Sequence, residues 1–426
     1  MPQPAPLRTA EIIAVGSELL GTTRIDTNSL YLAGQLAPLG IQLRAKSVVA
    51  DDRAALAAMI KGALARVDLL ILTGGLGPTD DDLTREAVAD VLGLELIEDA
   101  TIVERIRWRF ASRGLEMPEI NRRQAMVPER ATVLPNPHGT APGLLIEDGD
   151  RIVLLLPGPP RELQAVLAPV LDGALKTRAS GERIHSVSLF VTGRTESHVE
   201  EAAQPLYSQW RTSSPPIETT ILATPGQIEL HLFLRSNDDD AGKATLAHAQ
   251  ARLVQVLGDD VFSTDGRKME EVLGDLLAAN GLTIAAAESC TGGLMMSRMT
   301  DVPGSSTWVI GGAVAYSNSV KTAFADVDPA LIEQHGAVSE PVAMAMAEGI
   351  RTRLGADVGV GITGIAGPTG GTPAKPVGTV AIAAVVPGSP KRVRMMQLYG
   401  NRTQFKFNAA QAAMDMVRRA LSGATC

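Results

Sequence analysis

The chain has 426 residues, of which 45% are apolar, and it carries a formal net charge of −8. Its length predicts roughly two to three domains with sizeable cores, and its scattered Lys and Arg argue against nucleic acid as a direct partner. With only Cys290 and Cys426, a disulfide framework is excluded, and no apolar run is long enough for a transmembrane helix. We therefore expect a cytoplasmic protein with no membrane contact.

The N-terminal third alternates buried apolar runs with helical patterns. This alternation predicts an α/β domain, at residues 1–172, with a parallel sheet and helices on both of its faces. Ligands bind such sheets beyond the carboxyl ends of the strands, where the loops at residues 16–21 and 73–79 are expected. The predicted elements are strands at 11–16, 41–49 and 67–72 and helices at 28–39 and 54–66.

The second of these loops is rich in glycine, and glycine N–H groups can cradle a phosphate. It runs into Asp80, Asp81 and Asp82, and carboxylates can hold a hard divalent cation such as Mg²⁺. The alternative is that these acids only complement the dipole of the following helix. We expect a divalent cation at Asp81 and Asp82. The expected phosphate-site residues are Gly16, Glu18, Asn28, Gly74, Gly75, Gly77 and Thr79.

Several stretches of this region resemble the N-terminal domain of the CinA family, which is similar to the molybdopterin-binding fold of MoaB and MogA. They are AVGSELL at 14–20, DTNS at 26–29, TGGLGPTDDDLTRE at 73–86, NPHGTAPG at 136–143 and LPGPP at 156–160. The resemblance implies metal-dependent hydrolysis of ADP-ribose, and Asp82 matches an active-site aspartate of the pterin-binding relatives. Residues 21–25 read GTTRI, which departs from the family's usual pattern.

The middle of the chain, residues 173–260, has the pattern of a small α+β domain. It is bounded by predicted linkers at 172–182 and 262–267, and it shows no catalytic constellation. Its histidines lack the spacing of metal ligands, so we interpret it as a spacer or dimer-forming module. The predicted elements are strands at 184–192 and 227–234 and helices at 197–207 and 238–257.

The C-terminal domain, residues 261–426, contains a buried strand at 282–287 that stops at a polar turn before a helix starting near Leu294. Ser289 and Cys290 therefore lie side by side at a strand-to-helix turn, where a nucleophile can be exposed. Helix N–H groups near Thr291–Gly293 are expected to stabilise an oxyanion. The alternative is that Ser289 or Thr291 is only a helix N-cap.

A serine nucleophile needs a base, and Lys321 is the candidate because it begins a helix after the next strand. With Asn318 as the N-cap, Lys321 is the third helical residue, where the helix dipole and burial lower the pKa of its amine. The alternative is a solvated surface lysine. Cys290 is the second candidate nucleophile, activated by the same helix terminus.

A second glycine-rich loop, at 363–371, lies between two predicted buried strands and can wrap a ribose or phosphate. Arg402, at the start of the last helix, can hold a phosphate with two hydrogen bonds. The expected substrate-binding residues are Thr291, Gly292, Gly293, Ser305, Thr363, Gly364, Gly367, Gly370, Gly371 and Arg402.

This domain resembles the CinA C-terminal domain, a nicotinamide-nucleotide amidase, in five ordered motifs. They are AESCTGG at 287–293, YSNSVK at 316–321, GAVSE at 336–340, TGIAGPTGG at 363–371 and KPVGTV at 375–380. The resemblance implies hydrolysis of nicotinamide mononucleotide to nicotinate mononucleotide and ammonia, with the catalytic residues Ser289, Lys321 and Tyr316 and without a metal. It also suggests a homodimer. Asn401 replaces an acid of the family's usual Gly-Asp-Arg.

Two other functions stay open at this stage. The first is a ligand-binding regulator of competence or the DNA-damage response with inactive catalytic sites, against which the intact Ser289 and Lys321 argue. The second is molybdopterin binding by the N-terminal domain.

Overall fold

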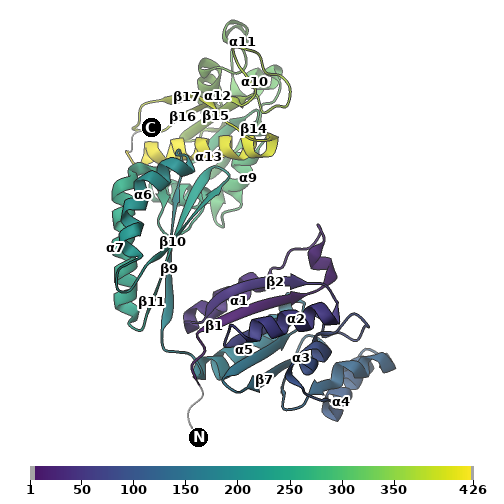
Figure 1. Cartoon of the computed structure of the whole chain (residues 1–426). Helices are drawn as coiled ribbons and strands as arrows, with labels where there is room; N and C mark the ends of the chain where they lie inside the picture. The colour runs from purple at the N-terminus through teal and green to yellow at the C-terminus, as the bar shows by residue number, and fades with distance from the viewer. Residues whose placement is uncertain (1–4, 424–426) are drawn as a thin grey trace. The chain divides into compact units, whose positions relative to one another are not determined.

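The computed structural model describes residues 5–423, which form two compact units (Figure 1). The first unit contains the residues up to 185 and Arg235–Lys243, and the second contains Ser186–Leu234 and the residues from 244 onward. Cys426 lies outside the described residues. Between residues 5 and 423, no helix is both long and apolar enough to cross a membrane.

The first unit is organised around a six-stranded sheet in the order β2-β1-β3-β8-β7-β6. β1, β2, β3 and β8 are parallel, as expected for the N-terminal strands. One face packs against α2, α3 and α4, and the other against α1 and α5. The elements are β1 (Thr9–Val15), α1 (Asn28–Leu36), β2 (Gln42–Val49), α2 (Arg53–Leu64), β3 (Leu69–Thr73), α3 (Thr84–Leu92), β4 (Leu96–Glu98), α4 (Ala100–Ala111), β5 (Met126–Pro128), β6 (Thr132–Leu134), β7 (Gly143–Asp148), β8 (Arg151–Leu156) and α5 (Pro160–Val170).

This sheet is not wholly parallel, which corrects the prediction. β7 runs antiparallel to β8, and β6 antiparallel to β7. Asp148 pairs with Arg151 across a tight turn in which Gly149 has a φ of 62°, a conformation that glycine adopts readily. A hairpin at this position reverses the chain without the crossover helix that a parallel neighbour needs.

The linker predicted at residues 172–182 is wrong in its first part. α5 continues into a π-helical turn at Leu171–Leu175, and Leu175 is fully buried in the core beneath α1 and α5. The polar residues around Leu175 concealed this turn, because one buried side chain per turn gives a weak apolar pattern.

The middle segment forms a four-stranded sheet in the order β10-β11-β9-β12. Every second residue of β11 from Ile228 to Leu234 is buried, as its alternation predicted, and the buried face packs against α6 and α7. Phe262 and Ser263 belong to β12 and are buried, so the predicted linker at 262–267 is also wrong in its first part. The elements are β9 (Arg183–Val191), α6 (Glu196–Trp210), β10 (Glu218–Thr224), β11 (Gln227–Ser236), α7 (Asp239–Leu257) and β12 (Val261–Ser263).

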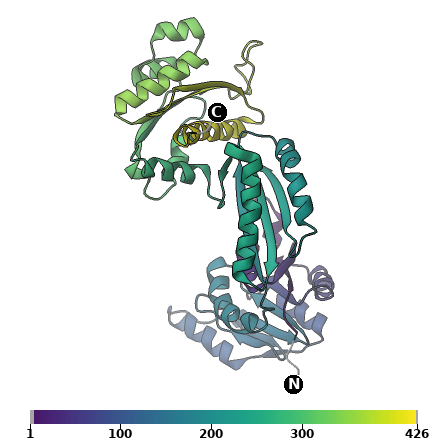
Figure 2. The ribbon, with the colours of Figure 1, turned by 90° about the vertical axis from the view of Figure 1, so that its left-hand side faces the viewer.

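The C-terminal domain is a five-stranded sheet in the order β14-β13-β15-β16-β17, with helices on both faces (Figure 2). β14, β13 and β15 are parallel, whereas β16 and β17 are antiparallel to their neighbours. α8, α9 and α13 cover one face, and α10, α11 and α12 the other. The elements are α8 (Met269–Ala279), β13 (Ile284–Glu288), α9 (Leu294–Thr300), β14 (Val309–Val314), α10 (Asn318–Ala325), α11 (Pro329–His335), α12 (Glu340–Leu354), β15 (Val358–Gly364), β16 (Thr379–Val385), β17 (Arg392–Gln397) and α13 (Arg402–Leu421).

β13 lies between two parallel strands, and this position explains its sequence. Ile284 and Ala286 contact the α8–α9–α13 layer, while Ala285 and Ala287 contact the opposite layer. A strand buried on both faces has no polar side to alternate with, so it reads as a continuous apolar run. The register pairs its last residue, Glu288, with Ile362 of β15, so the chain leaves β13 at the carboxyl edge of the parallel strands.

Candidate active site

The turn after β13 places Ser289, which is 7% exposed, at the carboxyl edge of the sheet. The Ser289 amide donates to the Ile362 carbonyl at 2.8 Å, and the Gly292 amide donates to the Ser289 carbonyl at 3.1 Å. Gly292 and Gly293 have φ values of 62° and 89°, so the chain reverses through two consecutive left-handed residues. Only glycine adopts that pair without a steric penalty, and the hydroxyl is held on a rigid turn.

The N-terminus of α9 is occupied by the buried carboxylate of Glu288. Its oxygens accept hydrogen bonds from the amides of Met295 at 3.1 Å and Met296 at 2.9 Å. The N-cap position belongs to Gly293, so the alternative in which Ser289 or Thr291 caps this helix is wrong. Of the oxyanion donors expected at Thr291–Gly293, the Gly292 amide is already bonded to the Ser289 carbonyl.

The side chain of Lys321 lies beside the Ser289 hydroxyl. Its Nζ is 3.2 Å from Ser289 Oγ and donates to the Tyr316 carbonyl at 3.0 Å, and the residue is 2% exposed. Burial lowers the pKa of Lys321. The N-cap is Ser317 rather than Asn318, so Lys321 is the fourth helical residue instead of the third. The alternative of a solvated lysine is wrong.

Cys290 is a poorer candidate nucleophile than its position in the sequence suggested. Its side chain is 5% exposed, and burial raises the pKa of the thiol to about 12. The thiolate is the reactive form of cysteine, and burial in apolar surroundings suppresses it. The packing therefore favours Ser289 over Cys290.

Tyr316 contacts Lys321 through its backbone carbonyl rather than through its phenol. Its carbonyl accepts the hydrogen bond from Lys321, while its exposed phenol accepts one from Arg402 at 3.2 Å. Arg402 also donates to the Gly367 carbonyl at 2.7 Å. Lys321 is therefore held by the main chain of Tyr316, while the Tyr316 side chain bonds to Arg402.

These groups surround a pocket of about 180 Å³. Six expected residues line it: Ser289, Tyr316, Lys321, Thr363, Gly364 and Arg402. Four further lining residues were not expected in the site, although all four lie within the quoted motifs: Asn318, Ala337, Val338 and Ala366.

The other expected substrate-binding residues lie outside this lining. Thr291 is fully buried, and its hydroxyl has no hydrogen-bond partner among residues 5–423. Ser305 lies in the short turn before β14, at the amino edge of the parallel strands, whereas Ser289 lies at the carboxyl edge. The residues that the structure leaves out of the pocket are Thr291, Gly292, Gly293, Ser305, Gly367, Gly370 and Gly371.

The glycines of the 363–371 loop serve the packing of the loop. A Cβ at Gly367 would lie 2.5 Å from Val377 Cγ1, and one at Gly371 would lie 2.6 Å from the Val377 amide nitrogen. Hydrogen bonds also hold the segment after this loop to the segment at residues 335–338. Lys375 Nζ donates to the carbonyls of His335 at 2.9 Å and Val338 at 2.7 Å. Close packing therefore accounts for Gly367 and Gly371 without a ligand.

In the first unit, the glycine-rich loop meets two other loops at the carboxyl ends of the strands. The Gly74 amide donates to the Leu156 carbonyl at 3.0 Å, and Asn28 Nδ2 donates to the Gly158 carbonyl at 2.7 Å. A Cβ at Gly74 would lie 2.4 Å from the Val15 carbonyl oxygen, and one at Gly75 would lie 2.2 Å from Thr84 Oγ1. Both glycines are therefore required by close packing. The expected residues Gly16 and Glu18 lie in the loop after β1.

The aspartates of this loop do not fit a preformed metal site. Asp82 accepts hydrogen bonds from the amides of Gly77 at 2.7 Å and Thr79 at 2.9 Å, and from the Thr79 hydroxyl at 2.5 Å. Its oxygens are therefore engaged in ordering the loop. Asp81 is exposed, and a hydrogen bond from the Thr79 side chain lowers its pKa. Across residues 5–423, no group of three or more His, Cys, Asp or Glu could hold a metal ion.

Comparisons with known proteins identify the family. Residues 266–421 match the family model described as "CinA C-terminal domain", and residues 11–177 match "Probable molybdopterin binding domain". A CinA-like protein of Koribacter versatilis is 45% identical over 416 residues, which cover 97% of this chain and 99% of the relative. A CinA-like protein of Acidobacterium capsulatum is 43% identical over 420 residues, covering 97% and 99%.

Among solved structures, the protein CinA of Thermoplasma acidophilum, whose function is described as unknown, is 33% identical, with a TM-score of 0.36. The match covers 38% of this chain and 97% of that one. Because relatives more than 40% identical span nearly the whole chain, this protein belongs to the CinA family, with a molybdopterin-binding-like N-terminal domain and a CinA C-terminal domain.

Proposed function

We propose that the C-terminal domain is an amidohydrolase that converts nicotinamide mononucleotide to nicotinate mononucleotide and ammonia with a Ser–Lys pair. The observation that supports this most is the 3.2 Å separation of Lys321 Nζ and Ser289 Oγ at the wall of a pocket. Within the described chain, Lys321 has no carboxylate within ion-pair distance, and burial lowers its pKa. A buried amine with a lowered pKa, in contact with a hydroxyl, suits a general base.

In the proposed reaction, neutral Lys321 accepts the proton of Ser289 as Oγ attacks the carboxamide carbon. Lys321 then returns this proton to the departing nitrogen, and ammonia leaves an acyl ester on Ser289. Water attacks the ester, with Lys321 again accepting a proton, and nicotinate mononucleotide is released as Ser289 regains its hydrogen. Asn318 provides an uncharged amide donor in the lining for the oxyanion.

The pocket volume fits the reacting end of this substrate. A cavity of about 180 Å³ is below the usual range for a whole drug-sized ligand, so we assign it to the pyridine ring and its carboxamide. Arg402 lies in the lining, where a guanidinium can contact the ribose phosphate. We propose this contact as its role.

The test is ammonia release from nicotinamide mononucleotide by the full chain in the presence of EDTA. Ser289→Ala and Lys321→Ala are expected to lower kcat by roughly 10²-fold or more, because each removes a group that reacts or transfers a proton. Cys290→Ala is the matched control and should stay active. If the wild-type protein releases no ammonia, the amidase function is excluded and the ligand-binding regulator becomes the better account.

The second candidate function is hydrolysis of ADP-ribose at the N-terminal site, where the convergence of three strand-end loops favours a phosphorylated ligand. Because Asp82 is engaged within its own loop, we assign no metal-dependent step there. Turnover of ADP-ribose that EDTA abolishes, and that Asp81→Asn reduces, would support a divalent cation at this site. A pterin absorbance band in the purified protein would instead favour molybdopterin binding.

A further inference from the structure

A second cavity lies in the second unit, apart from the pocket that Ser289 and Lys321 line. It is a cleft of about 870 Å³ between the middle sheet and the face of the C-terminal domain formed by β17 and α13. This volume is within the range of sites that enclose a drug-sized ligand, whereas the catalytic pocket of about 180 Å³ is not. The cleft therefore has room for a ligand as large as a mononucleotide.

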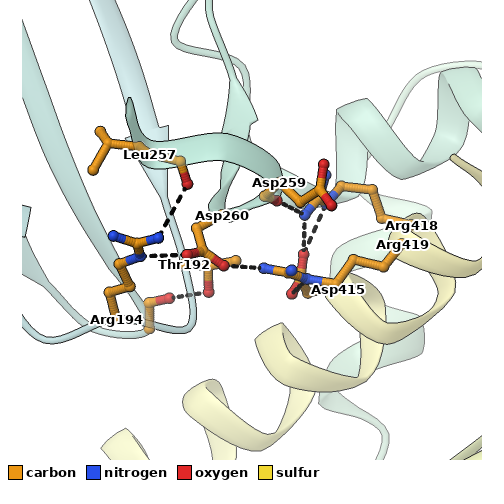
Figure 3. Close-up of polar contacts among 9 residues, drawn as sticks. Thr192, Arg194, Leu257, Asp259, Asp260, Asp415, Arg418 and Arg419 are labelled. Atoms are coloured by element: carbon orange, nitrogen blue, oxygen red, sulfur yellow. Dashed lines mark hydrogen bonds and ion pairs between the residues drawn. The ribbon is translucent and has the colours of Figure 1, made fainter. Parts of the chain in front are cut away.

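A chain of ion pairs runs along the cleft (Figure 3). Arg419 bridges Asp415 and Asp260, each at 2.7 Å, and Arg194 pairs with Asp260. All four side chains line the cleft. The two arginines and two aspartates have equal and opposite charges, so these ion pairs fix the shape of the cleft without giving it a net charge.

The C-terminal face of the cleft adds a further cation beside apolar surface. Arg394 of β17 lines the cleft and makes no ion pair or hydrogen bond with any of residues 5–423 through its side chain. Beside it, Met396 and Leu398 are partly buried, and the ring of Tyr399 is 80% exposed. A guanidinium next to an aromatic ring and apolar side chains suits a ligand that joins a phosphate to a flat ring.

We propose that this cleft binds a phosphorylated ligand with a flat ring, of the mononucleotide class, at a site separate from the catalytic pocket. The phosphate contacts Arg394, and the ring lies against Tyr399 and Leu398. The segment from Gln397 to Arg402 separates the two cavities: its first residues line the cleft, and Arg402 lines the pocket. A ligand in the cleft thus contacts the segment that positions a catalytic-pocket residue.

The test is isothermal titration calorimetry of the full chain with adenosine 5′-monophosphate, which has no carboxamide to react. We expect saturable binding that Arg394→Gln weakens roughly tenfold or more, because a charge-assisted hydrogen bond to phosphate is lost. Arg394→Lys should keep part of the affinity. Arg252→Gln, which makes the same charge change at an exposed residue outside the cleft, is the matched control and should leave it unchanged.

Two further comparisons decide between the cleft and the sites described above. Adenosine should bind at least tenfold more weakly than its monophosphate, and equal affinity would contradict the anion-binding assignment. Absence of binding, or binding that is lost in Arg402→Gln or Asn28→Ala but kept in Arg394→Gln, would place the ligand elsewhere and overturn the proposal. Retained ammonia release by Arg394→Gln would show that this variant is folded.

Discussion

The guanidinium of Arg402 donates a hydrogen bond of 3.2 Å to the phenol oxygen of Tyr316, and both residues line the candidate pocket. Arg402 begins the last helix, and Tyr316 follows the edge strand β14, so the bond joins two segments that lie 86 residues apart in the chain. It ties Arg402 to the wall that also carries the Tyr316 carbonyl, the acceptor of Lys321.

Tyr316→Phe separates the two contacts of this residue. The substitution removes the acceptor of Arg402 but keeps the backbone carbonyl that holds Lys321. We expect KM for nicotinamide mononucleotide to rise roughly two- to tenfold, with kcat nearly unchanged, because one partly exposed hydrogen bond is lost. Steady-state kinetics measure both constants. A large fall in kcat with an unchanged KM would mean that the phenol itself takes part in proton transfer.

The pH dependence should report the ionisation of Lys321. The base is active only when neutral, and burial lowers its pKa from the ordinary value of 10.5. The acidic limb of kcat/KM should therefore rise with pH, with its midpoint below 10.5. In the window between the folded and unfolded pKa values the unfolded chain binds more protons, so Lys321 makes stability increase with pH there. Lys321→Met should remove its contribution to that slope.

Cys290→Ala should leave the amidase active. The thiol is buried, and its pKa is raised to about 12, so it holds almost no thiolate at neutral pH. Iodoacetamide should accordingly modify the folded protein slowly, and the kcat of Cys290→Ala should stay within about threefold of wild type, less than a proton-transfer group contributes. Rapid inactivation by iodoacetamide that Cys290→Ala prevents would restore the thiol as a nucleophile.

Glu288→Gln should loosen the turn that carries Ser289. The carboxylate accepts from two amides of α9, and an amide side chain keeps only one acceptor oxygen for them. We expect a loss of about 1–3 kcal/mol in the free energy of unfolding, because a buried N–H loses its partner. Urea denaturation of the variant and of Glu333→Gln, at an exposed residue of α11, provides the measurement and its control. Equal midpoints would contradict the capping role.

The ion pairs of Asp260 should stop stabilising the fold at acidic pH. Burial opposes its charge, but the hydrogen bonds from Arg419 and Arg194 outweigh that effect and hold its pKa below the ordinary 3.8. For a carboxyl group with a lowered folded pKa, the stabilisation is present above the unfolded value and is lost as pH falls toward the folded one. Urea midpoints of wild type and Asp260→Asn should therefore differ at pH 7 and converge below about pH 3.8. A constant difference would exclude this linkage.

Local signals allowed the elements around the candidate site to be predicted. α2 was expected at residues 54–66 and is observed at Arg53–Leu64, because its apolar residues repeat at helical spacing. The strand before Ser289 was recognisable because burial on both faces removes all polar residues before Glu288. The linkers at 172–182 and 262–267 were partly wrong because Leu175 and Phe262 are buried by residues distant in the sequence.

The sequence by itself determined which chemical groups the site contains, since Ser289 and Lys321 are recognisable from their positions at strand ends. Only the tertiary structure decided how they are used. The packing of β13 between β14 and β15 brings Nζ within 3.2 Å of Oγ, and burial changes the pKa of both Lys321 and Cys290. It also assigns the α9 amides to Glu288 and removes Ser305 from the pocket. Distances and desolvation depend on residues far apart in the chain, and no local pattern encodes them.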